Sequence, residues 1–118
     1  DVYFNPVSID FFIKFLIKIL DKNISGIINI SSDKKISKYI FALKLAKRFN
    51  LDNKLIMPCF FKEIKKNNKL VNRPRNMSLN NKKLKAILKL KHIDIDNMIN
   101  TLYVSRRSKA ILSIKKIK

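Results

Sequence analysis

The fold is decided by residues 9 to 20, which read IDFFIKFLIKIL. Apolar side chains recur there at helical spacing, and only Lys14 and Lys18 mark a narrow polar side. Ser8 is a good N-cap, and Asp10 lies in the first turn, where the helix dipole favours a negative charge. So broad an apolar surface predicts a helix covered on two sides, which is more than a chain of 118 residues can easily supply.

The elements that follow this helix alternate in type. Residues 26–30, GIINI, predict a short buried strand, and Leu55–Met57 predict a second strand that stops at Pro58. Between them, Ser37 is the expected N-cap of a helix that runs to about Phe49.

Two further helices are predicted in the last third of the chain. Asn80 can cap a helix over residues 82–90, and Asp94 and Asp96 suit the start of another over residues 97–103. The order helix–strand–helix–strand–helix predicts the α/β class. We expect mainly helices with two short strands, which extend a sheet whose bulk can lie elsewhere.

The charge balance is strongly basic, with a net charge of +19. Such a field favours nucleic acid or other polyanions non-specifically. An alternative explanation of the positive charge is codon usage in an AT-rich genome, which enriches a solvated surface in Lys. Lys, Ile and Asn are all encoded by AT-rich codons, and Lys far outnumbers Arg in this chain. Residues 104–118 form a basic tail, either an amphipathic helix or a frayed end, after one expected domain over residues 1–103. No leader and no bilayer-spanning stretch is evident, so we expect a soluble, cytoplasmic protein without membrane partners.

The sequence lacks the motifs of a complete oxidoreductase. A dinucleotide-binding turn and a P-loop both need several glycines, and the chain has only Gly26. One His and one Cys, with scattered acidic residues, predict no metal site. Short-chain dehydrogenases use a Tyr with a Lys four residues on, but that spacing leads here from Tyr3 to Val7, from Tyr39 to Leu43 and from Tyr103 to Arg107. We therefore assign no catalytic residue and expect another segment to complete any hydride-transfer chemistry.

Residues 73–79, RPRNMSL, are the strongest candidate for a binding site. The guanidinium groups of Arg73 and Arg75 suit forked contacts with phosphate oxygens, and Asn76 and Ser78 add an amide and a hydroxyl. The segment also precedes a helix N-terminus, where free N–H groups favour anions. The alternative is a polar loop in which Asn76 and Ser78 satisfy the backbone of a local turn.

Three parts of the chain resemble, in order and at similar spacing, the C-terminal part of the dTDP-4-dehydrorhamnose reductase family of extended short-chain dehydrogenases. Residues 73–84, RPRNMSLNNKKL, resemble the RP-x-N-x-S-x-L stretch of that family. Residues 4–10, FNPVSID, resemble its N-P-V segment, which leads into a helix. Residues 26–32, GIINISS, and then residues 36–42, ISKYIFA, resemble a strand and the helix that follows it.

The resemblance implies the substrate-side portion of an NAD(P)H-dependent sugar-nucleotide reductase whose Rossmann half is missing from this chain. It also implies two groups of residues: substrate-binding Arg73, Arg75, Asn76 and Ser78, and, at the seam between the halves, Asn5, Pro6 and Asp10. The chain departs from the family at Ile40, where an acidic residue is common, and in the basic tail. The alternatives are an epimerase or non-catalytic relative, a decayed remnant, and a basic module for nucleic acid or another polyanion.

Overall fold

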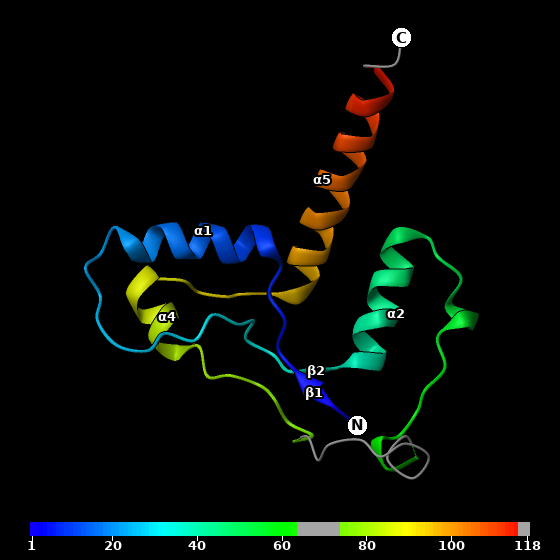
Figure 1. Cartoon of the computed structure of the whole chain (residues 1–118), viewed down its shortest axis with the longest axis horizontal. Helices are drawn as coiled ribbons and strands as arrows, with labels where there is room; N and C mark the ends of the chain where they lie inside the picture. The colour runs from blue at the N-terminus through cyan, green and yellow to red at the C-terminus, as the bar shows by residue number, and fades with distance from the viewer. Residues whose placement is uncertain (64–73, 116–118) are drawn as a thin grey trace.

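The computed structural model describes the backbone of residues 1–63 and 74–115, and the side chains of these ranges as far as Arg106. Most of this part is helical, with two short antiparallel strands, which is compatible with a small α/β fold. In chain order the elements are β1 (Tyr3–Phe4), α1 (Ile9–Leu20), β2 (Ile36–Ser37), α2 (Lys38–Phe49), the 3-10 turn η1 (Asn53–Leu55), α4 (Lys82–Leu88) and α5 (Ile95–Lys115) (Figure 1).

The helices begin close to where the sequence predicts, because capping depends on residues next to one another. The hydroxyl of Ser8 accepts from the N–H of Phe11 at 3.4 Å, and that of Ser37 accepts from the N–H of Ile40 at 3.2 Å. Asn50 then ends α2 in the left-handed conformation, with φ of 55°. Both predicted N-caps are confirmed.

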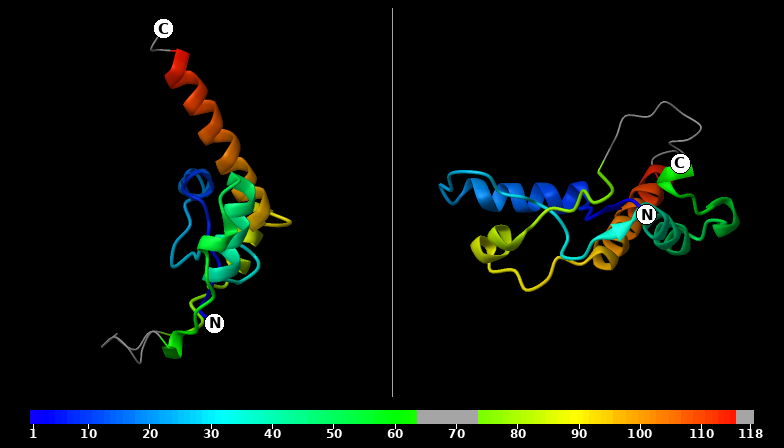
Figure 2. Two further views of the ribbon diagram at one scale, coloured as in Figure 1. Left: turned by 90° about the vertical axis from the view of Figure 1, so that its right-hand side faces the viewer. Right: turned by 90° about the horizontal axis from the view of Figure 1, so that it is seen from below.

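The last helix is longer than predicted. The carboxylate of Asp94 accepts from the N–H of Asn97 at 3.0 Å and so caps α5, whereas Asp96 pairs with Lys44 of α2 at 2.6 Å. The helix then continues through residues 104–115, which include good helix formers such as Lys, Arg and Ala, and it projects away from the rest of the chain (Figures 1 and 2). The stretch predicted as either helix or frayed end is therefore helical as far as residue 115.

The sheet joins three segments that are far apart in the sequence. β1 pairs with β2 in antiparallel register. On the other side of β1, the N–H of Tyr3 donates to the carbonyl of Arg75 at 2.7 Å, and the N–H of Met77 donates to the carbonyl of Tyr3 at 2.9 Å. These bonds form a parallel bridge that anchors residues 75–77 beside β1.

The two strands predicted from the sequence are wrong in position. Residues 26–30 run below α1 towards β2 but do not form a strand, and Leu55 belongs to η1 rather than to a strand. The turn forms there because Asp52 accepts from the N–H of Lys54 at 2.9 Å. A strand also needs a hydrogen-bonded neighbour, and in the described ranges neither predicted segment pairs with one.

The core consists of two hydrophobic clusters. The first lies where α1 and α4 meet the start of α5, and its buried members are Phe15, Leu84, Ile93 and Met98. The second lies between α2, α5 and the small sheet, and its buried members are Ile36, Ile95 and Ile99. Phe4 and Phe41 flank the second cluster with their rings edge to face, 5.4 Å between centroids.

Helix α1 is covered on one side, although the sequence predicts cover on two. Phe11, Phe15 and Ile19 face the first cluster, and Phe15 is only 5% exposed. The opposite face carries six large apolar side chains that are each 37% exposed or more: Ile9, Phe12, Ile13, Leu16, Ile17 and Leu20. Figure 2 shows α1 at the edge of the molecule.

Candidate functional site

Asn5 joins the two motifs that carry the family resemblance. Its side-chain oxygen accepts from the N–H of Leu79 at 2.9 Å, and its amide nitrogen donates to the carbonyl of Leu79 at 2.8 Å. An amide side chain that bonds both backbone groups of one residue imitates the pairing of a neighbouring strand. The Asn-Pro-Val segment is therefore held directly beside the RPRNMSL segment, 74 residues later in the chain.

The predicted substrate-binding residues differ in what they contact. The carboxamide oxygen of Asn76 accepts from the N–H of Ser78 at 3.2 Å and from its hydroxyl at 2.6 Å. These two side chains thus support a local turn. The guanidinium of Arg75 lies 3.5 Å from the carboxylate of Asp1 and remains 49% exposed. Arg73 lies outside the described residues.

The three predicted seam residues have different surroundings. Asn5 belongs to the clamp on Leu79, and Pro6 lines an apolar pocket between α2 and α5. Asp10 lies exposed in the first turn of α1, as expected for a charge that the helix dipole favours. The structure brings Asn5 together with the candidate binding segment and leaves Asp10 on the adjoining helix.

A second cation accompanies Arg75 at the sheet. The ammonium of Lys35 lies 5.3 Å from the ring centroid of Tyr3, close enough for a cation–π contact. Lys35 directly precedes β2, and Arg75 lies on the other side of β1, so these two residues flank the central strand. This arrangement suits contact with an anionic group.

Behind the clamp lies a buried polar network that the sequence prediction missed. Ser31 and Ser32 are almost fully buried, and Asn5 donates to the hydroxyl of Ser31 and the carbonyl of Ser32, each at 3.0 Å. Asn81, also buried, donates to the carbonyl of Ser31 at 2.9 Å. The sequence feature that could have predicted this network is the polar run of residues 31–33, which directly follows an apolar segment. Polar side chains that are buried at such a place need hydrogen-bond partners.

Asp33 anchors the far end of this network. Its carboxylate accepts from the side chain of Asn81 at 2.9 Å, from Lys85 at 3.1 Å and from the N–H of Ile93 at 3.2 Å. Burial alone would raise the pKa of Asp33, but these hydrogen bonds and the charge of Lys85 together hold that pKa below its ordinary value. The ionised carboxylate therefore ties β2, α4 and the approach to α5 together.

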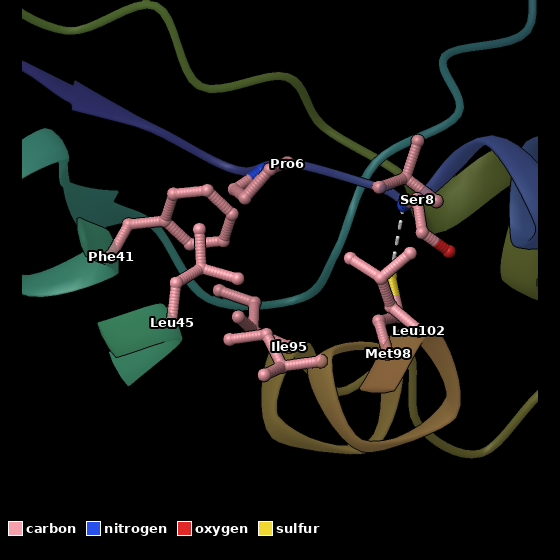
Figure 3. A pocket seen from close by; sticks show the side chains of 9 residues that line it. Pro6, Ser8, Phe41, Leu45, Ile95, Met98 and Leu102 are labelled. Atoms are coloured by element: carbon pink, nitrogen blue, oxygen red, sulfur yellow. Dashed lines mark hydrogen bonds between the residues drawn. The ribbon is translucent and has the colours of Figure 1, made fainter. Parts of the chain in front are cut away.

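The pocket beside Pro6 does not fit a nucleotide-sugar. Its lining is almost entirely apolar and comes from residues 6–8, α2 and α5, with Phe41, Leu45 and Met98 among the side chains (Figure 3). The dashed bond in the same view joins the N–H of Ser8 to the sulfur of Met98, 3.4 Å apart. A cavity volume of about 90 Å³ is also well below the roughly 300–1,000 Å³ of typical ligand sites. We therefore place the candidate site at Arg75 and Lys35.

The described part of the chain contains neither a group of metal ligands nor a membrane-spanning helix. Within residues 1–63 and 74–106, no three His, Cys, Asp or Glu side chains gather in a way that would hold a metal ion. Among the described helices, none is long and apolar enough to cross a membrane.

Cys59 is exposed, and partial desolvation together with the nearby Glu63 carboxylate raises the pKa of its thiol.

Comparisons with family models, curated proteins and solved structures found no match to this chain.

Proposed function

We propose that this chain is the nucleotide-sugar-binding portion of an NAD(P)H-dependent sugar-nucleotide reductase of the dTDP-4-dehydrorhamnose reductase type. It acts together with an N-terminal Rossmann half, and both work in the cytoplasm. The Rossmann half binds the cofactor, which supplies the hydride, and it carries the proton-donating residues. The role of the chain described here is to bind and orient the substrate.

The observation that carries this proposal is the clamp between Asn5 and Leu79. The two motifs that resemble the reductase family lie far apart in sequence, and nothing in their separate composition requires them to meet. Two backbone bonds of Tyr3 and two side-chain bonds of Asn5 hold them side by side. Motifs that serve one substrate pocket have to meet in this way.

Arg75 and Lys35 are the residues that we expect to face the substrate. A nucleotide-sugar carries two phosphates, and a half-exposed guanidinium can form forked bonds with their oxygens. The Arg75 side of its ion pair with Asp1 is half-exposed, whereas the Asp1 side chain is 23% exposed, so a substrate phosphate would replace Asp1 as the partner of this guanidinium. Asn76 and Ser78 shape the turn beside Arg75 and so position its backbone.

The outer face of α1 supports the requirement for a second half. Its apolar side chains include Ile17, which is 56% exposed, and Leu20, which is 69% exposed. Large exposed apolar patches mark surfaces that another protein covers.

The direct test is enzymatic and uses the chain together with the polypeptide encoded immediately upstream of Asp1. We expect NAD(P)H-dependent reduction of a 4-keto sugar nucleotide only when both parts are present. Arg75→Ala should raise KM about tenfold or more and leave kcat within about twofold, because the lost contact is to phosphate and not to the reacting carbonyl. Lys47→Ala, an exposed cation on α2, is the matched control and should change neither value.

Two results would overturn this proposal. The first is no reduction by the combined parts. The second is an Arg75→Ala protein whose KM equals that of the Lys47→Ala protein.

The alternative function is a basic module that binds nucleic acid or another polyanion. It is favoured by the net charge of +19 and by the projection of α5, whose outer part carries Arg106, Arg107 and Lys109 in sequence (Figure 1). Counterion release then predicts that the logarithm of the binding constant for heparin or duplex DNA falls linearly with the logarithm of salt concentration. If binding persists undiminished at high salt, charge alone does not explain it and this alternative is rejected.

A further inference from the structure

The carboxylate of Asp1 lies where an anionic ligand of Arg75 would bind. One of its oxygens, Oδ2, is 3.5 Å from Nη1 of Arg75, and the other, Oδ1, accepts from the N–H of Phe61 at 2.8 Å. The Asp1 side chain is 23% exposed, against 49% for that of Arg75, so the carboxylate is the more covered member of the pair. A guanidinium and a backbone N–H are also donors that proteins commonly offer to the oxygens of a phosphate group.

The small sheet fixes the position of Asp1. The N–H of Tyr3 donates to the carbonyl of Arg75 at 2.7 Å, and on the other side the carbonyl of Val2 accepts from the N–H of Lys38 at 3.2 Å. Asp1 directly precedes this bonded stretch, so its carboxylate is held near the guanidinium at a high effective concentration.

The contact between Asp1 and Arg75 is nevertheless a weak one. Its length of 3.5 Å exceeds the roughly 2.7–2.9 Å of a strong charge-assisted hydrogen bond. A phosphate group can form two shorter, parallel bonds with one guanidinium. Such a ligand can therefore displace the carboxylate, although it loses part of its binding free energy in doing so.

We propose that Asp1 is a built-in competitor, whose carboxylate occupies the phosphate site at Arg75 and lowers the affinity of this site for phosphate-bearing ligands. This inference rests on the proposed function, which assigns Arg75 to the phosphates of the nucleotide-sugar. An incoming phosphate has to take the guanidinium from Asp1, because two anions at one cation repel each other. The contact is thus autoinhibitory.

Titration calorimetry of the full chain with inorganic pyrophosphate tests the competition. Asp1→Asn removes the negative charge but keeps a side-chain oxygen that can accept from the N–H of Phe61, so it preserves the local backbone. We expect this variant to bind pyrophosphate about three- to fivefold more tightly, as expected when a partly exposed ion pair no longer competes. Unchanged or weaker binding would overturn the proposal, as would the absence of pyrophosphate binding by both proteins.

The matched control is Asp10→Asn, which makes the same change of charge at an exposed position of α1. In about 150 mM NaCl, charges further apart than about 8 Å are largely screened from one another. Asp10→Asn should therefore change the affinity for pyrophosphate by less than about 1.5-fold. A gain equal to that of Asp1→Asn would assign the effect to net charge and overturn the proposal.

A double variant shows whether Asp1 acts through Arg75. Arg75→Ala removes the guanidinium for which the carboxylate competes, so Arg75→Ala proteins with and without Asp1→Asn should bind pyrophosphate alike. A gain of about three- to fivefold in both backgrounds would contradict competition at this residue.

The remaining outcomes separate this inference from the proposed function. Tighter pyrophosphate binding by Asp1→Asn, without reductase activity of the combined parts, keeps the competition and removes the reductase. Activity together with an unchanged affinity for pyrophosphate keeps the reductase and removes the competition. In an active complex, Asp1→Asn should lower KM about three- to fivefold and leave kcat within about twofold. A raised KM would show that Asp1 helps to bind the substrate, which is the opposite of the proposal.

Discussion

Asn5 is the residue on which the junction of the two motifs depends. Its one carboxamide contacts four groups: the oxygen accepts from the N–H of Leu79, and the two N–H donors are shared among the carbonyls of Leu79 and Ser32 and the hydroxyl of Ser31. Neither Asp nor Gln can replace all of them, because Asp lacks the donor and Gln places it one methylene further away. The hydrogen bonds at this position therefore require an asparagine side chain.

Replacing Asn5 should weaken the fold measurably. Asn5→Ala removes the donor to the part-buried hydroxyl of Ser31 and carbonyl of Ser32, and each such loss costs about 1–3 kcal/mol, whereas water can replace the exposed bonds to Leu79. We expect the free energy of unfolding in urea to fall by at least about 2 kcal/mol. Asn53→Ala, at an exposed asparagine of η1, is the control and should change it by less than about 0.5 kcal/mol. A loss for Asn5→Ala no larger than that of the control would mean that the clamp is dispensable.

Asp33 should make the stability depend on acid pH. The pKa of this carboxyl is lowered in the folded chain, so its stabilisation is fully present above the unfolded value of about 3.9 and is lost as pH falls through the folded value. Asp33→Asn should therefore be less stable than the natural chain at pH 7, by about 1–3 kcal/mol. The difference should shrink below pH of about 4. Urea unfolding from pH 3 to pH 7 measures this, and a difference that stays constant across that range would rule out the ionised carboxylate as its source.

At the scale of elements, α1 has two apolar sides with different roles. Phe15 is buried in the first cluster, while Ile13 and Ile17 lie on the outer face with roughly half of their surface exposed. The difference follows from the helical positions of these residues, since Phe11, Phe15 and Ile19, which contact the first cluster, are spaced four residues apart along one stripe. One helix therefore contributes both to the core and to a surface that the described chain leaves uncovered.

Substitutions on the two sides of α1 should separate these roles. The double variant Ile13→Lys with Ile17→Lys should change the free energy of unfolding by less than about 1 kcal/mol in total and should reduce binding of the dye ANS. Phe15→Ala should cost about 3–5 kcal/mol, which is enough to unfold a marginally stable domain. Urea unfolding and ANS fluorescence together decide this. If the double variant unfolds as Phe15→Ala does, the outer face of α1 is packed within the chain.

At the scale of the whole molecule, the large positive net charge destabilises the folded state. There are 27 Lys and Arg residues against 8 Asp and Glu residues, and the described ion pairs are mostly at the surface. Repulsion among like charges destabilises the folded state, and salt screens it over a Debye length that falls to about 3 Å at 1 M.

Salt should therefore stabilise this protein. We expect the melting temperature to rise by several degrees between about 10 mM and 500 mM NaCl, in contrast to a protein whose stability depends on surface ion pairs. Scanning calorimetry or circular dichroism measures the shift. Equimolar sucrose controls for non-ionic effects, and a melting temperature that falls with NaCl would show that ion pairs outweigh the repulsion.

The amino-acid sequence by itself determined where helices begin. The hydroxyls of Ser8 and Ser37 and the carboxylate of Asp94 begin helices where expected, because helix bonds and caps join residues three or four positions apart. That a chain with one glycine holds no dinucleotide-binding turn remains a prediction from the sequence. The reductase resemblance and the substrate role of residues 73–78 remain predictions.

Only the tertiary structure decided the sheet and the candidate site. The sequence placed strands at residues 26–30 and 55–57, but ladder bonds formed at β1, β2 and residues 75–77. Strand pairing joins residues that are distant in sequence, so side-chain pattern predicts a strand only when its partner is present. For the same reason, the bonds from Asn5 to Leu79 and from Asn81 to Ser31 are not evident in either segment alone, since each depends on two segments meeting in space.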